Sequence, residues 1–386
     1  MHVDWSEWLN LAFRWLHLIA GIAWIGSSFY FVWLDNHLKQ PASGEASGEV
    51  WSVHGGGFYH NQKYQVAPAQ MPAELHWFKW EAYFTWLSGF SLLVLIYYVG
   101  ADTFLLDPSR APLSPAAGIA IVLGALLLGW LVYDLLCRSP LGANNALLGL
   151  FWFVILFWAG LVLNGLFNPR AAYIHIGAMI GTVMVANVFF IIIPNQRKVV
   201  ADLVAGRTPD PKLGAQAKQR SLHNNYMTLP VLFIMISQHY PMTFGAGRPW
   251  LVLALLGLTG VAIRHVFNLR GRGKPYGATI VLAVALAAAS VTYVTLEKGA
   301  VATGPAQNVT YAQVAPILAT HCASCHNVSP PPRGVALDSY AHVRAAAPRI
   351  KAVAVDTQTM PLGNPTHMTP AERQRLGAWI AAGTPR

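Results

Sequence analysis

Two cysteines and a histidine near the C-terminus form the most specific chemical motif in the chain. Residues 322–326 read CASCH, which places two thiols three residues apart and an imidazole directly after them. This is the attachment pattern of a c-type haem, in which the thiols add to the vinyl groups and the histidine binds iron. A zinc half-site would need a second cysteine pair, and the whole chain has three cysteines. We therefore predict covalent haem c at Cys322 and Cys325, with His326 as an iron ligand.

A second iron ligand is expected downstream, and methionine is the usual partner of histidine in cytochromes c. The candidates are Met360, in TMPLGN, and Met368, in THMTPAE. Residues 369–372 form a capping signal for the final helix, which places Met368 at a helix entrance. We therefore predict Met360 as the ligand. The other histidines of this region are expected to face solvent: His321, His342 and His367.

The elements that position these groups are mostly membrane helices. The chain has 386 residues and is 54% hydrophobic and 11% charged, whereas soluble domains carry about 25% charged residues. A helical crossing needs about 20 mostly apolar residues. Eight stretches qualify, and the sixth is the weakest because it contains Pro230, His239 and Pro241. The stretches are 8–34, 81–99, 116–137, 146–167, 171–194, 226–243, 249–268 and 276–296.

Basic residues in the connections set the orientation. Alternate connections, beginning with 35–80, carry most of the loop lysines and arginines, whereas the opposite ones hold Arg110, Arg170 and Arg248. Because basic loops stay in the cytoplasm, both ends of the membrane domain are predicted to lie outside. The net charge of +10 is then a topological signal, and we expect no nucleic-acid partner.

The predicted architecture is all-α with two domains. Residues 1–299 form an eight-helix transmembrane bundle, 300–310 a linker of small and polar residues, and 311–386 a small class I cytochrome c domain. In that domain the pattern favours short helices around 310–325 and 370–382. Because this domain follows the last outward crossing, it is expected in the periplasm.

The membrane part also shows weak internal similarity, which would correspond to a four-plus-four helix repeat. His17 and His175 occupy equivalent places in the first and fifth helices, and His76 and His223 precede the second and sixth. Chance similarity between apolar helices is the alternative.

Three histidines are expected in the outer third of membrane helices: His17, His175 and His239. Polar groups at this depth are costly and usually face the bundle interior. Imidazoles on different helices at one depth can ligate a b-type haem. Hydrogen bonding to a neighbouring helix backbone is the alternative for each of them.

The inner ends of the helices carry a denser set of polar groups. They offer cationic, hydrogen-bonding and aromatic side chains around one pocket that faces the cytoplasm, which suits a planar anion, and the histidines can take protons. A solvated loop with interfacial aromatic residues is the alternative. If the two halves are related by the four-plus-four repeat, we also expect Asp134, on the third helix, to pair with Arg264. The set in chain order is His76, Trp80, His223, Asn224, Asn225, Arg264 and His265.

These features together resemble the membrane-bound, cytochrome c-coupled urate oxidase family, over essentially the whole chain. The resemblance is carried by WLHLIAGIAWIGSSFYFVWLDNHL, HGGGFYHNQKY, HWFKWEAYFTWLSGF, NNYMTLPVLFIMISQHYP, IRHVFNLR, and CASCH with MPLGNPTHMT. CASCH alone occurs in a very large population of cytochromes, and the membrane segments are more specific. The first helix is also similar to that of the protoporphyrinogen oxidase membrane family, where a haem-binding histidine precedes an aromatic-Ile-Gly run, as His17 precedes residues 24–26.

The resemblance implies a urate oxidase of the bacterial inner membrane that forms 5-hydroxyisourate and sends electrons through haem c to the respiratory chain. A soluble cytochrome c or a terminal oxidase would accept them. It further implies that Arg264 binds the urate oxygens, that Asn224 and Asn225 bond the ring edges and that Trp80 stacks on the ring. Protons would go to His76, His223 or His265.

Two alternatives to this function stay open. One is a membrane-anchored electron-transfer subunit that passes electrons from a quinol or a partner dehydrogenase to an oxidase, without substrate chemistry of its own. The other is the same enzyme acting on another purine or on a porphyrinogen.

Overall fold

The computed structural model describes residues 5–301 and 309–386, except 42–43, 45, 65–66, 69, 330, 332–333, 357, 363 and 365. The described chain is mostly helical, as predicted. Most of the predicted linker 300–310 lies outside the described residues. Its first two residues end the last helix of the membrane part, and Val309 is already buried in the C-terminal domain.

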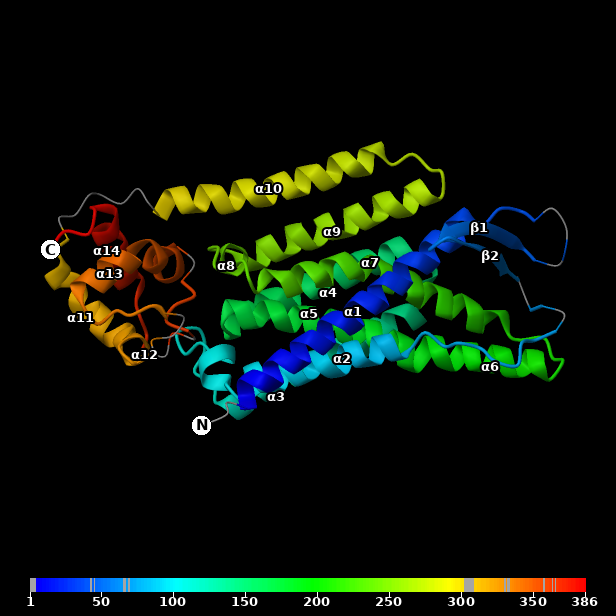
Figure 1. Cartoon of the computed structure of the whole chain (residues 1–386), viewed down its shortest axis with the longest axis horizontal. Helices are drawn as coiled ribbons and strands as arrows, with labels where there is room; N and C mark the ends of the chain where they lie inside the picture. Colours follow the sequence, from blue (N-terminus) through cyan, green and yellow to red (C-terminus); the bar gives the residue numbers. More distant parts are fainter. Residues whose placement is uncertain are drawn as a thin grey trace.

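The N-terminal part is a bundle of long helices that run back and forth along one axis (Figure 1). Its α-helices are α1 (Trp5–His37), α2 (Trp80–Leu93), α3 (Pro115–Arg138), α4 (Asn145–Leu166), α5 (Pro169–Ala186), α6 (Ile193–Val204), α7 (Pro211–Ser237), α8 (Pro241–Phe244), α9 (Pro249–Gly271) and α10 (Gly277–Val301). Three short segments have wider, π-helical turns: η1 (Val94–Tyr98), η2 (Ala101–Leu105) and η4 (Asn187–Ile192). One has tighter, 3₁₀-helical turns: η3 (Pro140–Ala143).

Six described helices are long and apolar enough to cross a membrane. They are Trp5–His37, Pro115–Arg138, Asn145–Leu166, Pro169–Val204, Pro249–Gly271 and Gly277–Leu296. Each coincides with a predicted crossing. The predicted stretch 81–99 corresponds to α2 with η1, and 226–243 to the second half of α7 with the turn that follows and α8. For these two stretches crossing remains a prediction.

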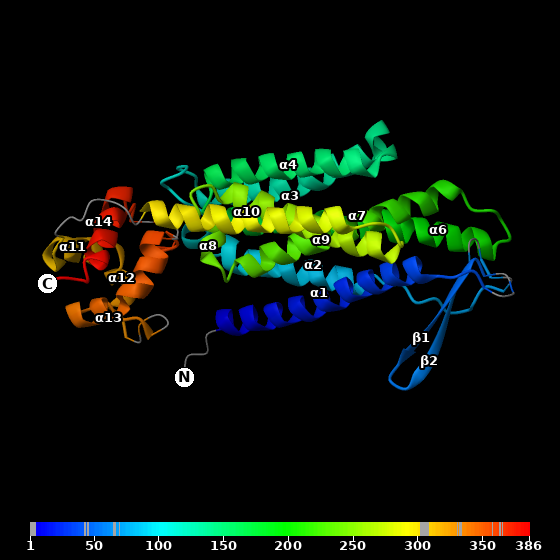
Figure 2. The same cartoon turned by 90° about the horizontal axis from the view of Figure 1, so that it is seen from above.

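Helix α7 packs against both α5 and α9 (Figure 1), and it runs beside α9 along the bundle axis (Figure 2). It crosses α9 closely, because a Cβ added to Gly260 would stand 3.1 Å from the backbone nitrogen of Pro230 and 3.2 Å from the carbonyl carbon of Leu229. Glycine at residue 260 favours this close approach, since a larger side chain would press against the α7 backbone, which has little room to move in a packed bundle.

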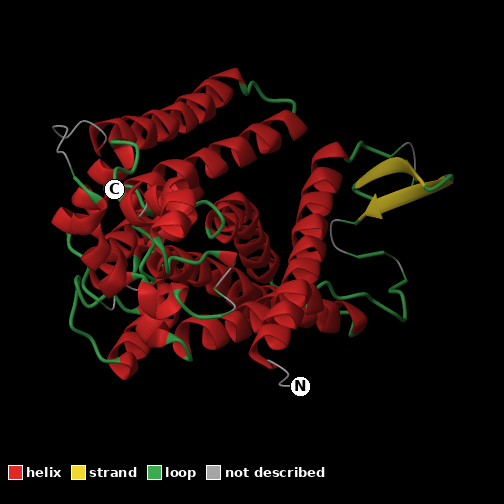
Figure 3. Ribbon diagram, turned by 60° about the vertical axis from the view of Figure 1, so that its left-hand side comes forward, coloured by secondary structure: helices red, strands yellow, loops and turns green. Residues whose placement is uncertain are grey.

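A β-hairpin follows α1, so the prediction of an all-α fold was wrong for this segment (Figure 3). Strand β1 (Gly48–His54) pairs antiparallel with β2 (Gly57–Lys63), and His54 is opposite Gly57. Gly55 and Gly56 both have positive φ, of 58° and 79°. A two-residue turn of this kind matches strand twist and requires positive φ at both positions. The three consecutive glycines thus supply hairpin geometry.

The C-terminal domain consists of α11 (Tyr311–His321), α12 (Ala323–His326), α13 (Tyr340–Ile350), η6 (Lys351–Asp356) and α14 (Pro370–Ala381). Helices α11 with α12 and α14 agree with the predicted ranges, whereas α13 was not predicted. Val314, Val343, Leu376 and Trp379 are buried in one apolar core. The domain lies at the end of the bundle where α1 begins and α10 ends (Figure 1).

We expect Gly260→Val to destabilise the bundle by about 1–3 kcal/mol, the usual effect of overpacking at a tight contact. The measurement is thermal unfolding of the purified protein in detergent. Gly257→Ala is the matched control on the same helix, because a Cβ there has no other atom within 4 Å. An unchanged unfolding temperature for Gly260→Val would contradict the close crossing.

Candidate functional site

Polar residues near the middle of α7 point to different sides of the helix. Several of them are buried between helices, and a buried polar group needs a partner inside the bundle. Their partners come from α3, α9 and the segment η4, and they form two separate polar clusters and one cavity lining.

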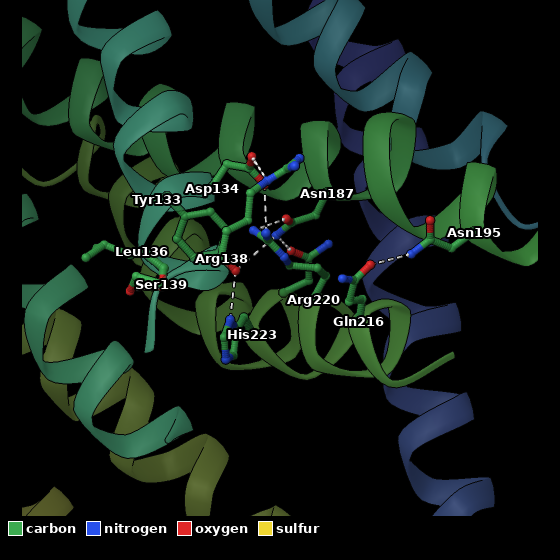
Figure 4. A network of polar contacts seen from close by, with 11 residues as sticks. Tyr133, Asp134, Leu136, Arg138, Ser139, Asn187, Asn195, Gln216, Arg220 and His223 are labelled. Carbon is green, nitrogen blue, oxygen red and sulfur yellow. Dashed lines mark hydrogen bonds and ion pairs between the residues drawn. The ribbon is translucent and has the colours of Figure 1, made fainter. Parts of the chain in front are cut away.

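The first cluster lies between α7, α3 and η4 (Figure 4). His223 Nδ1 lies 2.8 Å from Tyr133 Oη, and Asn187 Nδ2 donates to Asn224 Oδ1 at 2.9 Å. Asn224 Nδ2 in turn donates to the carbonyl oxygen of Met184. Asn224 therefore has partners for both of its amide atoms and joins α7 to the end of α5 and to η4.

The same cluster contains a neutralised arginine. Arg220 is only 3% exposed, and its Nη2 lies 2.7 Å from Asp134 Oδ1. The other carboxylate oxygen of Asp134 pairs with Arg138 at 2.6 Å. The prediction that Asp134 pairs with Arg264 was therefore wrong. Arg220 reaches the carboxylate from α7, whereas Arg264 lies on the far side of that helix.

The second cluster surrounds Arg264 on α9. This residue is 6% exposed, and its Nε donates to Asn225 Oδ1 at 2.8 Å. Asn268 Nδ2 shares the same oxygen at 3.2 Å. The Phe29 ring of α1 covers the guanidinium, with 4.0 Å between Cζ and the ring centroid. The two helices thus bring together Arg264 and Asn225, as the sequence predicted for a binding site.

The Arg264 cluster has unsatisfied groups. Among the described residues no carboxylate forms an ion pair with Arg264. Asn225 Nδ2 and Asn268 Oδ1 are buried and have no hydrogen-bond partner. Burying an unpaired charge costs several kcal/mol, on the order of the value for each ion of a buried pair. A planar anion with both donor and acceptor groups would satisfy all three side chains.

A cavity of about 620 Å³ lies on the other side of the contact between α7 and α9, against α4. His265 and His223 both line it, as do Tyr226 and Arg272. Tyr226 Oη lies 2.7 Å from His265 Nδ1, so the cavity is bordered by two tyrosine–histidine pairs. Two possible proton acceptors are therefore close to the Arg264 cluster in sequence: His265 follows Arg264 on α9, and His223 precedes Asn225 by two residues on α7.

Two predicted site residues lie elsewhere. Trp80 begins α2 and is 58% exposed, and His76 is exposed four residues earlier, where it contacts Phe78. Within the described part of the chain, neither side chain bonds to Arg264, Asn225 or His265.

The three predicted haem b residues have different surroundings. His17 Nδ1 is 2.9 Å from the carbonyl oxygen of Thr85 on α2. His175 is 1% exposed, its Nδ1 bonds the carbonyl oxygen of Ala171, and its buried Nε2 has no partner. His239 is exposed in the turn after α7. Of the three, His175 offers a buried nitrogen that is ready to bind a metal.

The C-terminal domain brings the predicted haem c residues close together. Cys322 lies between α11 and α12, and Cys325 and His326 follow in α12. His326 Nδ1 lies 2.8 Å from the carbonyl oxygen of Val335, so a neutral ring donates there and leaves Nε2 to bind iron. Both thiols are free of disulfides. Two thiols and an oriented imidazole fit covalent haem c.

Met360 is held by a buried arginine that the sequence reading missed. Arg373 is 6% exposed, and its Nη1 donates to the carbonyl oxygens of Met360, at 2.6 Å, and Ala354, at 2.5 Å. Met360 packs partly buried against the domain core. Met368 is 3% exposed within that core, immediately before the helix cap, which agrees with its expected place at a helix entrance.

One prediction about the domain's histidines was wrong. His321 is buried, with Nδ1 at 2.7 Å from Thr366 Oγ1 and Nε2 at 3.3 Å from Glu372 Oε1. His342 and His367 are exposed, as predicted. Hydrogen bonds from the Thr369 backbone and hydroxyl, together with His321, lower the pKa of Glu372 to about 2. The carboxylate therefore stays ionised and ties α11 to the start of α14.

The sequence did not point to four other contributors to the two membrane clusters: Phe29, Tyr133, Asn187 and Arg220. Asn187 had a usable signal, since it interrupts an apolar run at membrane depth. It opens the wide turn η4, just before Pro194, which has no backbone N–H to donate. Wide helical turns of this kind are frequent at functional sites.

Residues 4–295 match the model of the family described as urate oxidase N-terminal. The match includes all of the membrane clusters and ends before the C-terminal domain. No curated protein matches the chain, and no solved structure matches it.

We expect Arg373→Met to release the Met360 loop, because both carbonyl bonds are lost. In protein that still carries covalent haem, the charge-transfer band of sulfur bound to ferric haem should disappear and the reduction potential should fall, since methionine ligation raises it. Arg373→Lys should restore part of both. Arg375→Met is the matched control, because that residue is exposed on the same helix. A normal spectrum and potential in Arg373→Met would show that Arg373 does not position Met360.

Proposed function

Because the chain belongs to the urate oxidase N-terminal family, we propose that it is a membrane-bound urate oxidase that converts urate to 5-hydroxyisourate. The observation that carries the proposal is the Arg264 cluster: a buried cation without a described carboxylate, next to two amides with unpaired atoms. A carrier without substrate chemistry would have no use for such a group. Urate is a planar anion whose carbonyl and N–H groups alternate around two fused rings.

In this proposal Arg264 binds the urate oxygens through charge-assisted hydrogen bonds, which are stronger than neutral ones. The free Asn225 Nδ2 donates to a ring acceptor, and Asn268 Oδ1 accepts from a ring N–H. Phe29 covers the guanidinium, so urate entry displaces this ring, a rotamer change common at binding sites. Once displaced, the ring can stack on the purine.

Oxidation combines urate with water and releases two electrons and two protons. His265, bonded to Tyr226 and adjacent to Arg264 in sequence, accepts one proton. His223, bonded to Tyr133, accepts the other. Neutral histidines at hydrogen-bonding distance from a phenol are suited to this role. Haem c, held by Cys322, Cys325 and His326 with Met360 as second ligand, supplies one-electron transfer to a soluble cytochrome c or a terminal oxidase.

The proposal includes eight crossings with both ends of the membrane domain outside. The six long apolar helices support it, as does the alternation of basic connections. The C-terminal domain then lies in the periplasm of a bacterial inner membrane, where haem c is attached.

We expect anaerobic urate alone to reduce the c-type band of the purified full chain, and Arg264→Gln to lower the urate specificity constant about 100-fold. Loss of one partner in a buried charged contact costs 2–5 kcal/mol or more, and each 1.36 kcal/mol is about tenfold. Arg270→Gln, at an exposed site on the same helix, is the control.

Two results would contradict this assignment. Normal urate-dependent reduction in Arg264→Gln would remove that residue from the site. Reduction of wild type only after addition of a second dehydrogenase would favour the electron-transfer subunit.

Haem b, predicted at His17, His175 or His239, stays a prediction. The free Nε2 of His175 supports His175 as the ligand. A pyridine haemochrome assay should find b-type haem beside c-type haem in wild type, and His175→Ala should lose the b-type signal while keeping the c-type one. Equal b-type content in both proteins would exclude His175, and none in wild type would exclude the cofactor.

A further inference from the structure

The cavity beside α4 is larger and more apolar than urate requires. Polar groups border only its inner end, near the start of α4, the end of α9 and the inner half of α7: Asn145, His223, Tyr226, His265 and Arg272. The rest is lined by apolar side chains and glycines, from Trp152 and Leu258 to Gly160 and Trp250. The fifteen-residue path along α4 from Asn145 to Gly160 rises about 20 Å, at about 1.5 Å per residue. The cavity is therefore an elongated space with one polar end.

This space also reaches the side of the bundle that faces lipid. Leu150 and Val261 both line it, yet they are 57% and 36% exposed. A ligand with a long apolar chain can therefore enter from the bilayer without crossing a polar surface.

The polar end presents two hydrogen-bonded pairs on neighbouring turns, Tyr133 with His223 and Tyr226 with His265. A ring with two carbonyl oxygens can accept a hydrogen bond from each pair and receive a proton there on reduction. A simple acyl chain would leave these groups unused.

Electron transfer from the Arg264 cluster to the C-terminal domain also calls for an electron carrier, which the cavity could bind. The Arg264 cluster lies in the inner part of α9, whereas the C-terminal domain lies at the opposite end of the bundle (Figure 1). The hydrocarbon core of a bilayer is about 30 Å thick, so an intermediate carrier is needed between the two, and a quinone is one that can move.

From these observations we propose that the cavity binds an isoprenoid quinone, with its ring against the two tyrosine–histidine pairs and its chain along α4 and α9. The proposal rests on the proposed function and names the acceptor of the urate electrons. Urate and water give 5-hydroxyisourate, two electrons and two protons, and the quinone takes both electrons and both protons to become quinol. Quinol leaves through the lateral opening, and on reoxidation to quinone it would pass its two electrons singly to haem c and release its two protons to water.

The test uses the full chain, purified in detergent and freed of quinone, under anaerobic conditions with urate and decylubiquinone. One quinone should be reduced for each urate consumed. Gly257→Phe should slow this reduction about tenfold, because Gly257 lines the apolar arm with no atom within 4 Å of an added Cβ, and a phenyl ring would fill that space. Gly124→Phe is the matched control, since Gly124 on α3 has the same open surroundings and does not line the cavity.

The outcomes separate the two proposals. If urate reduces neither quinone nor haem c, the proposed function fails. If quinone-free protein reduces haem c at the full rate and decylubiquinone stays oxidised, the quinone proposal fails while the urate oxidase stands. Equal rates of quinone reduction in Gly257→Phe and Gly124→Phe also overturn the quinone proposal, because the reaction then does not use this cavity. Haem c reduction that requires quinone, with the loss confined to Gly257→Phe, supports it.

Discussion

The close crossing of α7 and α9 is the contact on which the membrane part of the molecule depends. Gly260 has no side chain, so the α9 backbone can approach Pro230 of α7 closely. Pro230 itself has no backbone N–H to donate. At that separation Asn225 reaches Arg264 on one side, and Tyr226 reaches His265 on the other. The substrate cluster and the cavity thus share one helix pair, and a change in the crossing would alter both.

The two buried arginines on these helices, Arg220 and Arg264, have different partners, and this difference distinguishes a structural role from a proposed binding role. Arg220 meets Asp134 at 2.7 Å, so its charge is matched and it ties α7 to α3. Arg264 has only an amide oxygen and an aromatic face as described partners. Burying a charge without a counterion lowers the stability of the ligand-free protein, and binding of an anion would offset that cost. That difference is why Arg264, and not Arg220, is assigned to urate.

The two chemistries in the proposed function would take place at opposite ends of the bundle. Two-electron oxidation is proposed at the Arg264 cluster between α7 and α9, and one-electron transfer in the C-terminal domain, where buried Arg373 bonds the carbonyl oxygen of Met360. Their separation explains why a large cavity with a polar end and an apolar arm is useful between them, since it accepts a carrier that is soluble in the bilayer.

Much of the architecture follows from local composition. Runs of about 20 apolar residues have no stable alternative to a helix in a membrane, so the six helices that are long and apolar enough to cross one were predictable from hydropathy. The haem c prediction at CASCH is equally local, because the two cysteines for covalent attachment and the histidine for iron lie within five consecutive residues. The hairpin was missed because its signal, three consecutive glycines, also fits a flexible loop. Pairings between helices, such as Asp134 with Arg220, depend on the rotation of each helix about its axis. Residue types therefore determined a helical membrane protein with a haem c motif and a set of polar candidates. Only packing decided which of them meet, because neighbours along a helix such as Asn224 and Asn225 point to different sides and find different partners.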